Sequence, residues 1–392
     1  MGASARESEH SKEPPVSSPR GLYIHVPFCL YRCYYCDFAT SPHVPGVVDP
    51  FLESVRREAA TYASADSSIA SIYLGGGTPS VLSGDQMLRL LAAMRATFPV
   101  SDGVEVTVEA NPETLAAAKL RAYRDAGVTR LSIGVQALDD ATLKRLGRDH
   151  TAEHSTRAVR MARDADFESV SVDLIFGLPG QDSEHWSATL QDGLALRPDH
   201  ISLYGLTVEP KTVFDFMRRQ QTLSVPSDDQ QADMYAEAID TALAAGYEHY
   251  EISSFASPGH ESRHNMTYWA DESYIGLGPS ACGYLAGRRY ANVRGTRSYM
   301  KRVDAGDSAV VEEETLTGID ARAQTLMLGL RRLGGVRRDD YHRRYGRDIV
   351  DDFGDTMAPL EDAGLLRLSA ASIRLTRRGV LLSNEVFVRL LP

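Results

Sequence analysis

The sequence predicts an α/β protein: a partial, TIM-like (β/α)6 barrel followed by a small α+β domain. From residue 21 to about residue 205, short runs rich in Val, Ile and Tyr alternate with longer helical stretches, which indicates parallel βαβ units. Polar residues follow several of these runs, and the carboxyl ends of barrel strands face one common mouth. Because the six expected units are fewer than the eight of a complete barrel, we expect the barrel to remain open.

The expected strands are short, rich in β-branched and aromatic residues, and followed in most cases by Gly or Pro. They cover residues 22–26, 72–74, 104–109, 130–135, 170–176 and 200–204, and the expected helices cover residues 48–63, 84–97, 114–126, 139–165 and 183–195. A doubly wound sheet is the main alternative, but it would gather its polar residues at one switch point. Thr78, Glu109, Gln136 and Asp173 instead follow four different strands, which favours the barrel.

The pattern changes after residue 205. Residues 226–246 are predicted to form a helix and residues 250–253 a short strand, after which a Gly/Ser/Pro-rich stretch begins. The segment beyond residue 310 resembles a winged-helix module. Its expected elements are helices at 321–333, 338–345 and 349–363, a hairpin at 365–375 and a final helix. We therefore expect a disordered leader (1–20), the barrel (21–250), a connecting region (251–310) and a C-terminal domain (311–392).

The composition argues against several classes of protein. With 42 Lys and Arg against 53 Asp and Glu, the net charge is −11, whereas nucleic-acid binding depends on basic side chains. No stretch approaches the roughly 20 apolar residues of a membrane span, and the polar N-terminus lacks the apolar centre of a secretion signal. Four Cys in 392 residues are too few for a secreted disulfide scaffold, so we expect a cytoplasmic protein.

Three of the Cys lie close together, at Cys29, Cys33 and Cys36. A loop with this spacing can wrap three thiolates around one face of an iron–sulfur cluster. Because a four-iron cluster normally takes four thiolates, one iron would stay open for a small ligand. Two alternatives remain: a structural zinc with His25 as its fourth ligand, and a disulfide with one free thiol.

The CxxxCxxC motif after the first strand of a partial barrel resembles that of the radical S-adenosylmethionine (SAM) superfamily, and the resemblance extends over residues 21–392. It implies that Cys29, Cys33 and Cys36 hold a [4Fe-4S] cluster. In that family the amino and carboxylate groups of SAM chelate the fourth iron, so the resemblance implies SAM as a second cofactor, which the protein orients. Whether SAM is cleaved stays open.

Further segments carry the same resemblance. Gly75-Gly76-Gly77-Thr78-Pro79-Ser80 follows the second expected strand; alone it would equally suit a tight turn, but here Gly76, Gly77 and Thr78 resemble the family's motif for the SAM amino group. Single polar residues at strand ends are more often surface or capping residues. Together they resemble the SAM contacts of the coproporphyrinogen-oxidase-like branch, which implies SAM contacts at Glu109, Gln136, Arg148 and Asp173, with Tyr23 and Tyr35 beside the cofactor.

Two families of that branch must be separated: oxygen-independent coproporphyrinogen III oxidase, which decarboxylates two propionates of a porphyrinogen, and the HemW heme chaperones. Phe38 stands where the oxidase carries an additional Cys, and the leader is shorter than the oxidase's N-terminal segment. Residues 264–269 match the HNxxYW signature of the HemW family, which is tied there to heme binding. These features favour the chaperone family.

The signature residues suit a heme. His264 offers an imidazole, a common axial ligand of heme iron, and Tyr268 and Trp269 offer flat surfaces for a porphyrin. The alternative explanation is a loop His beside two packing aromatic residues. Cys282 departs from the family pattern and receives no role.

The sequence thus predicts a cytoplasmic heme chaperone with a SAM-ligated [4Fe-4S] cluster, for which oxidase activity is not expected. The expected partners are heme and a heme-acceptor protein such as a membrane respiratory enzyme. The oxidase is the alternative function. The acceptor, the oligomeric state and the mode of heme attachment stay open.

Replacing Cys33 with Ser removes one expected cluster thiolate, so we expect the iron content of the reconstituted protein to collapse. Iron and sulfide analysis of the anaerobic protein measures this, with Cys282→Ser as the matched control that keeps its iron. Wild-type iron content in the Cys33→Ser variant would contradict the assignment.

Overall fold

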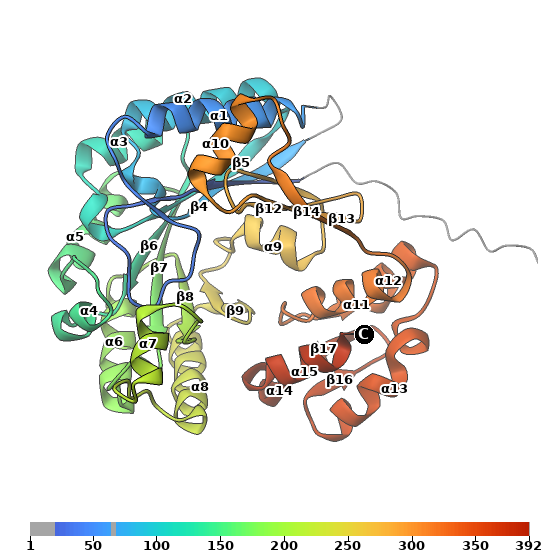
Figure 1. The fold of residues 1–392 in the computed structure, drawn as a ribbon. Helices are drawn as coiled ribbons and strands as arrows, with labels where there is room; N and C mark the ends of the chain where they lie inside the picture. Colours follow the sequence, from blue (N-terminus) through green and yellow to red (C-terminus); the bar gives the residue numbers. More distant parts are fainter. Residues whose placement is uncertain (1–19, 64–67, 392) are drawn as a thin grey trace, which may run out of the picture.

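Figure 1 shows the fold of the chain as a computed structural model. The structure describes residues 20–63 and 68–391. The expected leader, residues 1–20, lies outside the described residues except for Arg20. Within the described ranges, no helix combines the length and the apolar composition that a membrane crossing requires.

One mixed sheet forms the centre of the molecule, in the order β14-β13-β12-β11-β1-β4-β5-β6-β7-β8-β10-β9. Its parallel strands are β11 (Tyr274–Leu277), β1 (Gly21–Val26), β4 (Ile69–Gly76), β5 (Val100–Ala110), β6 (Arg130–Gln136), β7 (Ser169–Phe176) and β8 (His200–Gly205). The strands expected from the sequence are β1 and β4 to β8, and they are confirmed. Because β14 and β9 end the sheet without pairing to each other, the barrel is partial, as predicted.

Helices cover the outer face of the parallel strands (Figure 1). They are α1 (Val48–Ala60), α2 (Gly84–Thr97), α3 (Ala117–Asp125), α4 (Asp140–Arg145), α5 (Ala152–Asp164), α6 (Ser183–Ala195), α7 (Val213–Arg219) and α8 (Asp228–Ala244). Along β1, Leu22 and Ile24 are fully buried in the apolar core, whereas Tyr23 contacts Tyr73 and His264 instead. This alternation follows from the two-residue period of a strand and gives the barrel a polar interior.

Short elements shape the loops after the first three barrel strands. They are β2 (Phe28–Cys29), β3 (Ser41–Pro42), η1 (Pro79–Val81) and η2 (Pro112–Thr114). The parallel pair β2–β3 fixes both ends of the loop that carries the three clustered cysteines. That loop is therefore held against the mouth of the barrel.

The expected single helix over residues 139–165 is wrong, because α4 and α5 are separate helices. Gly147 has φ +70°, a left-handed conformation that ends α4, and Thr151 then caps α5 by a reciprocal hydrogen-bond pair with His154. Arg148 lies in the break between the two helices. The interruption brings the Arg148 side chain to the barrel mouth. An unbroken helix would have kept this side chain in the outer helical layer.

The region after α8 contains more regular structure than its Gly/Ser/Pro-rich sequence predicts. It forms β9 (Glu248–Glu251), β10 (Ser254–Ala256), α9 (Arg263–Trp269), β11, β12 (Cys282–Leu285), β13 (Arg288–Asn292), α10 (Thr296–Asp304) and β14 (Val310–Thr315). The expected strand 250–253 is therefore placed wrongly, since Ile252 and Ser253 form a turn. Gly276 is required in β11, because a Cβ there would lie 2.0 Å from the carbonyl oxygen of Cys282.

The C-terminal part forms a small α+β unit, as expected. Its elements are α11 (Gly318–Gly329), β15 (Val336–Arg337), α12 (Arg338–Tyr345), α13 (Ile349–Asp362), β16 (Leu366–Leu368), β17 (Ser372–Leu375), α14 (Arg377–Leu381) and α15 (Ser383–Leu390). The three strands form an antiparallel sheet in the order β15-β17-β16. This unit joins the connecting region through Asp271, which pairs with Arg344 (2.8 Å) and accepts a hydrogen bond from Gln324 (2.6 Å).

A buried carboxylate ties α1 to β11, β13 and α10. Glu58 is 4% exposed and accepts hydrogen bonds from the Gly278 amide (2.8 Å), Asn292 Nδ2 (2.6 Å) and the Tyr299 hydroxyl (2.6 Å). Burial raises the pKa of Glu58 to about 7, although the three donors oppose the shift. The extension of the sheet is therefore held by one polar cluster.

Replacing Glu58 with Ala leaves three buried donors without their acceptor, so we expect a loss of unfolding free energy on the order of 3 kcal/mol. Urea unfolding measures it. Glu53→Ala, on the exposed side of the same helix, is the control and is expected to change stability by about 0.5 kcal/mol or less. Equal effects of the two substitutions would contradict the role of Glu58.

Candidate functional site

A cavity of about 350 Å³ opens at the carboxyl ends of the barrel strands; we call it the mouth cavity. Its lining brings together most of the residues singled out in the sequence, namely Cys29, Cys33, Tyr35, Cys36, Gly76, Gly77, Thr78, Glu109, Gln136, Arg148 and Asp173. These residues come from six different segments of the chain. Their convergence is the consequence of parallel strands that all point the same way.

The three clustered cysteines are free thiols on the loop after β1. The Thr78 hydroxyl donates a hydrogen bond to Cys29 Sγ (3.4 Å), and Arg148 Nη1 donates one to Cys33 Sγ (3.4 Å). Burial raises the pKa of Cys29, and it raises that of Cys36 to about 11. Three thiols on one cavity wall, with a cation beside them, are the donor set that an iron–sulfur cluster requires.

The alternative zinc site is not supported. The ring of His25 is bonded through Nε2 to the Ala39 carbonyl (2.9 Å) and through Nδ1 to the Tyr23 hydroxyl (3.1 Å), so it does not face the thiols as a fourth ligand.

Two carboxylates that line the mouth cavity lie on β5 and β7, on either side of β6. Glu109 accepts hydrogen bonds from the Tyr73 hydroxyl (2.8 Å) and the Gly76 amide (3.1 Å), and Asp173 accepts from Ser132 (3.0 Å). Burial and the nearby Asp173 raise the pKa of Glu109 to about 7, and burial raises the pKa of Asp173 to about 6. Both groups hold protons more tightly than ordinary acids.

Two further polar atoms of residues that line this cavity lack hydrogen-bond partners. Arg148 Nη2 donates to Asn111 Oδ1 (2.9 Å) and the Gly134 carbonyl (2.7 Å), but its buried Nε has no hydrogen-bond partner. Gln136 Oε1 is likewise buried without a partner, and the residue has a left-handed φ of +68°. Unsatisfied buried polar atoms and a strained backbone at a strand end are typical of ligand sites. The donor set of this cavity therefore fits a cluster with a polar organic ligand.

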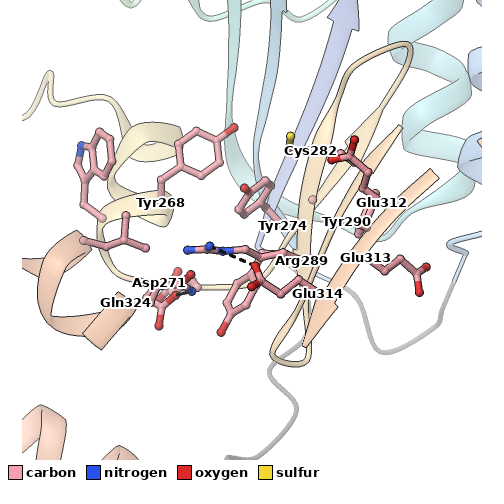
Figure 2. Close-up of a pocket in the computed structure, with 16 residues that line it drawn as sticks. Tyr268, Asp271, Tyr274, Cys282, Arg289, Tyr290, Glu312, Glu313, Glu314 and Gln324 are labelled. Atoms are coloured by element: carbon pink, nitrogen blue, oxygen red, sulfur yellow. Dashed lines mark hydrogen bonds and ion pairs between the residues drawn. The ribbon is translucent and has the colours of Figure 1, made fainter. Parts of the chain in front are cut away.

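Two further cavities lie beside the mouth cavity. The bridging cavity, about 320 Å³, is lined by Tyr23 and shares Phe38, Gly76 and Glu109 with the mouth cavity. Tyr23 thus lies next to the mouth cavity rather than in its wall. The larger edge cavity, about 590 Å³, lies between α9, the strands β11 to β14 and α11 (Figure 2).

Aromatic side chains form much of the edge cavity. Its lining includes Tyr268, Trp269, Tyr274, Tyr284 and Tyr290, together with Cys282, Arg289 and Gln324. Figure 2 shows Tyr268 of α9 on one side of the cavity and Tyr274, Arg289 and Tyr290 of β11 and β13 on the other. The structure therefore brings Tyr268 and Trp269 of the sequence signature to a cavity of substantial size.

His264 is not brought to any of the three cavities. It is 1% exposed inside the barrel, where its Nδ1 bonds the Ser71 hydroxyl (2.9 Å) and its Nε2 bonds the Tyr268 hydroxyl (2.7 Å). Its ring stacks on Tyr73 with centroids 5.1 Å apart, and burial lowers its pKa to about 3. In this arrangement neither ring nitrogen is free for iron, so the expectation of a direct heme contact is not supported.

The sequence reasoning missed several lining residues. Tyr73, Ser132 and Tyr204 line the mouth cavity from the interior face of β4, β6 and β8. Counting back in steps of two from Gln136 would have found Ser132. Arg289 and Gln324 line the edge cavity and carry no local signal, because that cavity depends on strands and a helix that are distant in sequence.

Comparisons with known proteins agree with this geometry. Residues 23–193 match the radical SAM superfamily, and residues 316–382 match the HemN C-terminal domain. The heme chaperone HemW of Bacillus subtilis is 37% identical over 371 residues, covering 94% of this chain and 98% of that protein. That of Escherichia coli is 39% identical over 300 residues, covering 74% and 77%. The solved coproporphyrinogen III oxidase HemN of Escherichia coli, a radical SAM enzyme, superposes with a TM-score of 0.83 at 25% identity, covering 95% of this chain and 90% of that one.

The raised pKa of Glu109 predicts how stability depends on pH. The carboxyl titrates at about 7 in the folded protein and at about 4.3 in an unfolded chain, so the folded state holds the proton more tightly. This stabilisation is complete below about pH 4 and is lost as the pH rises through about 7. Because Glu109→Gln cannot ionise, we expect the variant to lose less unfolding free energy than the wild type between about pH 5 and about pH 8.

Urea unfolding of the cluster-free protein across this pH range measures the difference. Asp233→Asn, an exposed position on α8, is the control and should keep the wild-type profile. Parallel profiles for the wild type and Glu109→Gln would show that Glu109 does not titrate in this range.

Proposed function

Because the chain belongs to the HemW family of heme chaperones within the radical SAM superfamily, we propose that it binds heme and delivers it to an acceptor protein. The observation that carries this proposal is the 37% identity to the Bacillus subtilis heme chaperone, which extends over 98% of that protein. The edge cavity supports it, because about 590 Å³ lies within the roughly 300–1,000 Å³ of small-molecule sites and its walls are rich in aromatic side chains.

The radical SAM family implies a [4Fe-4S] cluster and SAM. We assign the cluster to Cys29, Cys33 and Cys36; when bound, it would hold SAM at its open iron and would supply the electron for any cleavage of SAM. Arg148 and Thr78 donate hydrogen bonds to two of these sulfurs and so stabilise their anionic form against the cost of burial. The break between α4 and α5 places this arginine in the lining of the mouth cavity.

The remaining mouth residues are proposed to orient SAM. The unpartnered Arg148 Nε suits a carboxylate, and the unpartnered Gln136 Oε1 suits an N–H or O–H donor of the ligand. Glu109 and Asp173 suit amine or ribose donors deeper in the cavity. Gly76 and Gly77 allow the backbone to approach closely, with Tyr35 in the same wall and Tyr23 behind it in the bridging cavity.

Heme is proposed to occupy the edge cavity, with Tyr268 and Trp269 against the porphyrin. His264 then acts as a positioning residue: it holds the Tyr268 hydroxyl and anchors α9 inside the barrel through Ser71. Within the HNxxYW signature, the histidine thus holds the tyrosine hydroxyl in place by a hydrogen bond. The Arg331 guanidinium lies 4.3 Å from the Trp269 ring centroid and supports that ring from the C-terminal unit.

The oxidase remains the second candidate, because the oxidase HemN superposes with a TM-score of 0.83. The sequence identity favours the chaperone, because the chain is 37% identical to HemW of Bacillus subtilis and 25% identical to the oxidase. Phe38, which is 60% exposed at the junction of the mouth and bridging cavities, places an apolar ring where the oxidase carries a Cys. A substrate that must enter past this ring would meet no thiol there.

We propose that the barrel (21–250), the connecting region (251–310) and the C-terminal unit (311–392) act together, since the edge cavity is lined by the last two. A reducing compartment such as the cytoplasm suits the three free thiols of the mouth cavity. The acceptor is proposed to be a heme-dependent protein, which includes membrane respiratory enzymes.

A single anaerobic preparation with reconstituted cluster tests the function. We expect it to bind hemin and, with SAM and a reductant, to leave coproporphyrinogen III unconverted. Trp269→Ala is expected to weaken hemin binding roughly 2- to 10-fold, as an aromatic contact of about 0.5–1.5 kcal/mol is lost. Phe216→Ala, at an exposed aromatic residue of α7, is the matched control. Formation of protoporphyrinogen IX would overturn the chaperone assignment.

A further inference from the structure

The edge cavity and the bridging cavity meet at three side chains: Tyr268, Tyr274 and Cys282. Cys282 begins β12 and is an exposed, free thiol. Its contact is a weak one, to the Ser280 carbonyl at 4.0 Å. Figure 2 shows its sulfur beside Tyr274 at one end of the edge cavity, on the same side as the strand β12. The thiol is therefore available to a ligand in either cavity.

Two other side chains near this cavity that could bind a heme iron are already hydrogen-bonded, His264 and Tyr290. His264 uses both ring nitrogens, and one of them holds the Tyr268 hydroxyl. The Tyr290 hydroxyl bonds both the amide (2.9 Å) and the carbonyl (3.2 Å) of Gly276. Heme iron takes imidazole, phenolate or thiolate ligands in proteins. Tyr274 and Tyr284 also line the cavity, but burial raises the pKa of each hydroxyl to about 12. A thiol, with an ordinary pKa of about 8.5 against about 10 for a phenol, is the easier of the two to ionise, which favours the Cys282 sulfur.

The wall of the edge cavity also includes two residues with a buried polar atom that has no hydrogen-bond partner, Gln324 and Trp269. Gln324 is 4% exposed, and its Oε1 has no partner although its Nε2 donates to Asp271 (2.6 Å). The indole Nε1 of Trp269 is buried without an acceptor. Arg289 lies in the same wall, only loosely paired with Glu314 at 3.7 Å. An N–H donor and a cation of this kind suit the carboxylates of a planar apolar ligand.

We propose that Cys282 is an axial ligand of heme iron in the edge cavity, with Trp269 and Arg289 facing the propionates. This inference rests on the proposed heme-binding function and assigns the iron ligand to a residue outside the HNxxYW signature. On binding, the S–H bond breaks, the proton leaves to solvent and an Fe–S bond forms. No oxidant or reductant is consumed, and one proton is released for each heme bound.

The surroundings of Cys282 keep its thiol protonated in the absence of heme iron. Burial and the nearby Glu312 carboxylate raise the pKa of the thiol, although Arg289 opposes them. The free thiol is therefore protonated at neutral pH and a poor nucleophile. Cys282 also lines the bridging cavity, whose wall includes Glu109 and Phe38.

The test compares the wild type with Cys282→Ser, both with reconstituted cluster so that the other three thiols are occupied, and with equal iron content before titration. Hemin binding is followed by absorbance, by electron paramagnetic resonance and by the Soret band of the ferrous carbonyl complex, which is strongly red-shifted for a thiolate ligand. We expect the wild type to show the thiolate signature and Cys282→Ser to lose it, with hemin affinity lowered on the order of 10- to 100-fold.

Iron-free protoporphyrin IX is the matched control ligand, because it fills the same cavity without needing an axial ligand. Its affinity is expected to be equal in both proteins. His264→Gln, which can keep the bonds to Ser71 and Tyr268, should retain the thiolate signature. Identical hemin spectra and affinities of the wild type and Cys282→Ser would overturn this inference and leave the heme-binding function standing. A wild type that binds neither hemin nor protoporphyrin would instead overturn the proposed function itself.

Discussion

The arrangement of the whole molecule depends on the backbone pairing of β1 along both of its edges. Residues Gly21–Val26 pair in parallel with β4, and Gly21–Ile24 pair in parallel with β11, which lies about 250 residues further along the chain. This double pairing places the cysteine loop after β1 between two sets of strands. On one side lie β4 to β8 with the mouth cavity, and on the other lie β11 to β14 with the edge cavity. Cluster and heme are thereby proposed to occupy neighbouring sites on one rigid sheet.

The polar interior of the barrel explains how these sites are kept open. Apolar side chains of β1 such as Leu22 and Ile24 pack against the helices, so the opposite faces of the strands are left to polar residues such as Tyr73, Glu109 and Asp173. The far end of this interior is filled by α9, whose first turn bonds Glu105 and whose His264 bonds Ser71. The same helix, α9, therefore closes this end of the barrel and carries Tyr268 and Trp269 of the edge cavity.

The parts of the fold that could be predicted from the sequence are those with local signals. The barrel strands, the cysteine loop and most of the mouth cavity follow from β-rich runs, Gly and Pro punctuation and one cysteine spacing. The extension β11 to β14 was missed because its strands are short and are stabilised by distant partners such as Glu58. The break before α5 depends on the left-handed Gly147, and the burial of His264 depends on Ser71, which lies 193 residues earlier. No short window of sequence contains both Ser71 and His264, whereas Gly147 and the Thr151–His154 cap are local signals that the helical pattern over 139–165 masked.

The central claim is that SAM and heme bind in two separate cavities, the mouth cavity and the edge cavity, which are connected by the bridging cavity. The most direct measurement is a hemin titration of the cluster-reconstituted protein with and without saturating SAM, each binding followed by its own signal. The account predicts that both ligands bind at once, with a hemin affinity that changes no more than a few-fold because the sites are only weakly coupled. Stoichiometric displacement of hemin by SAM would show a single shared site and contradict the account.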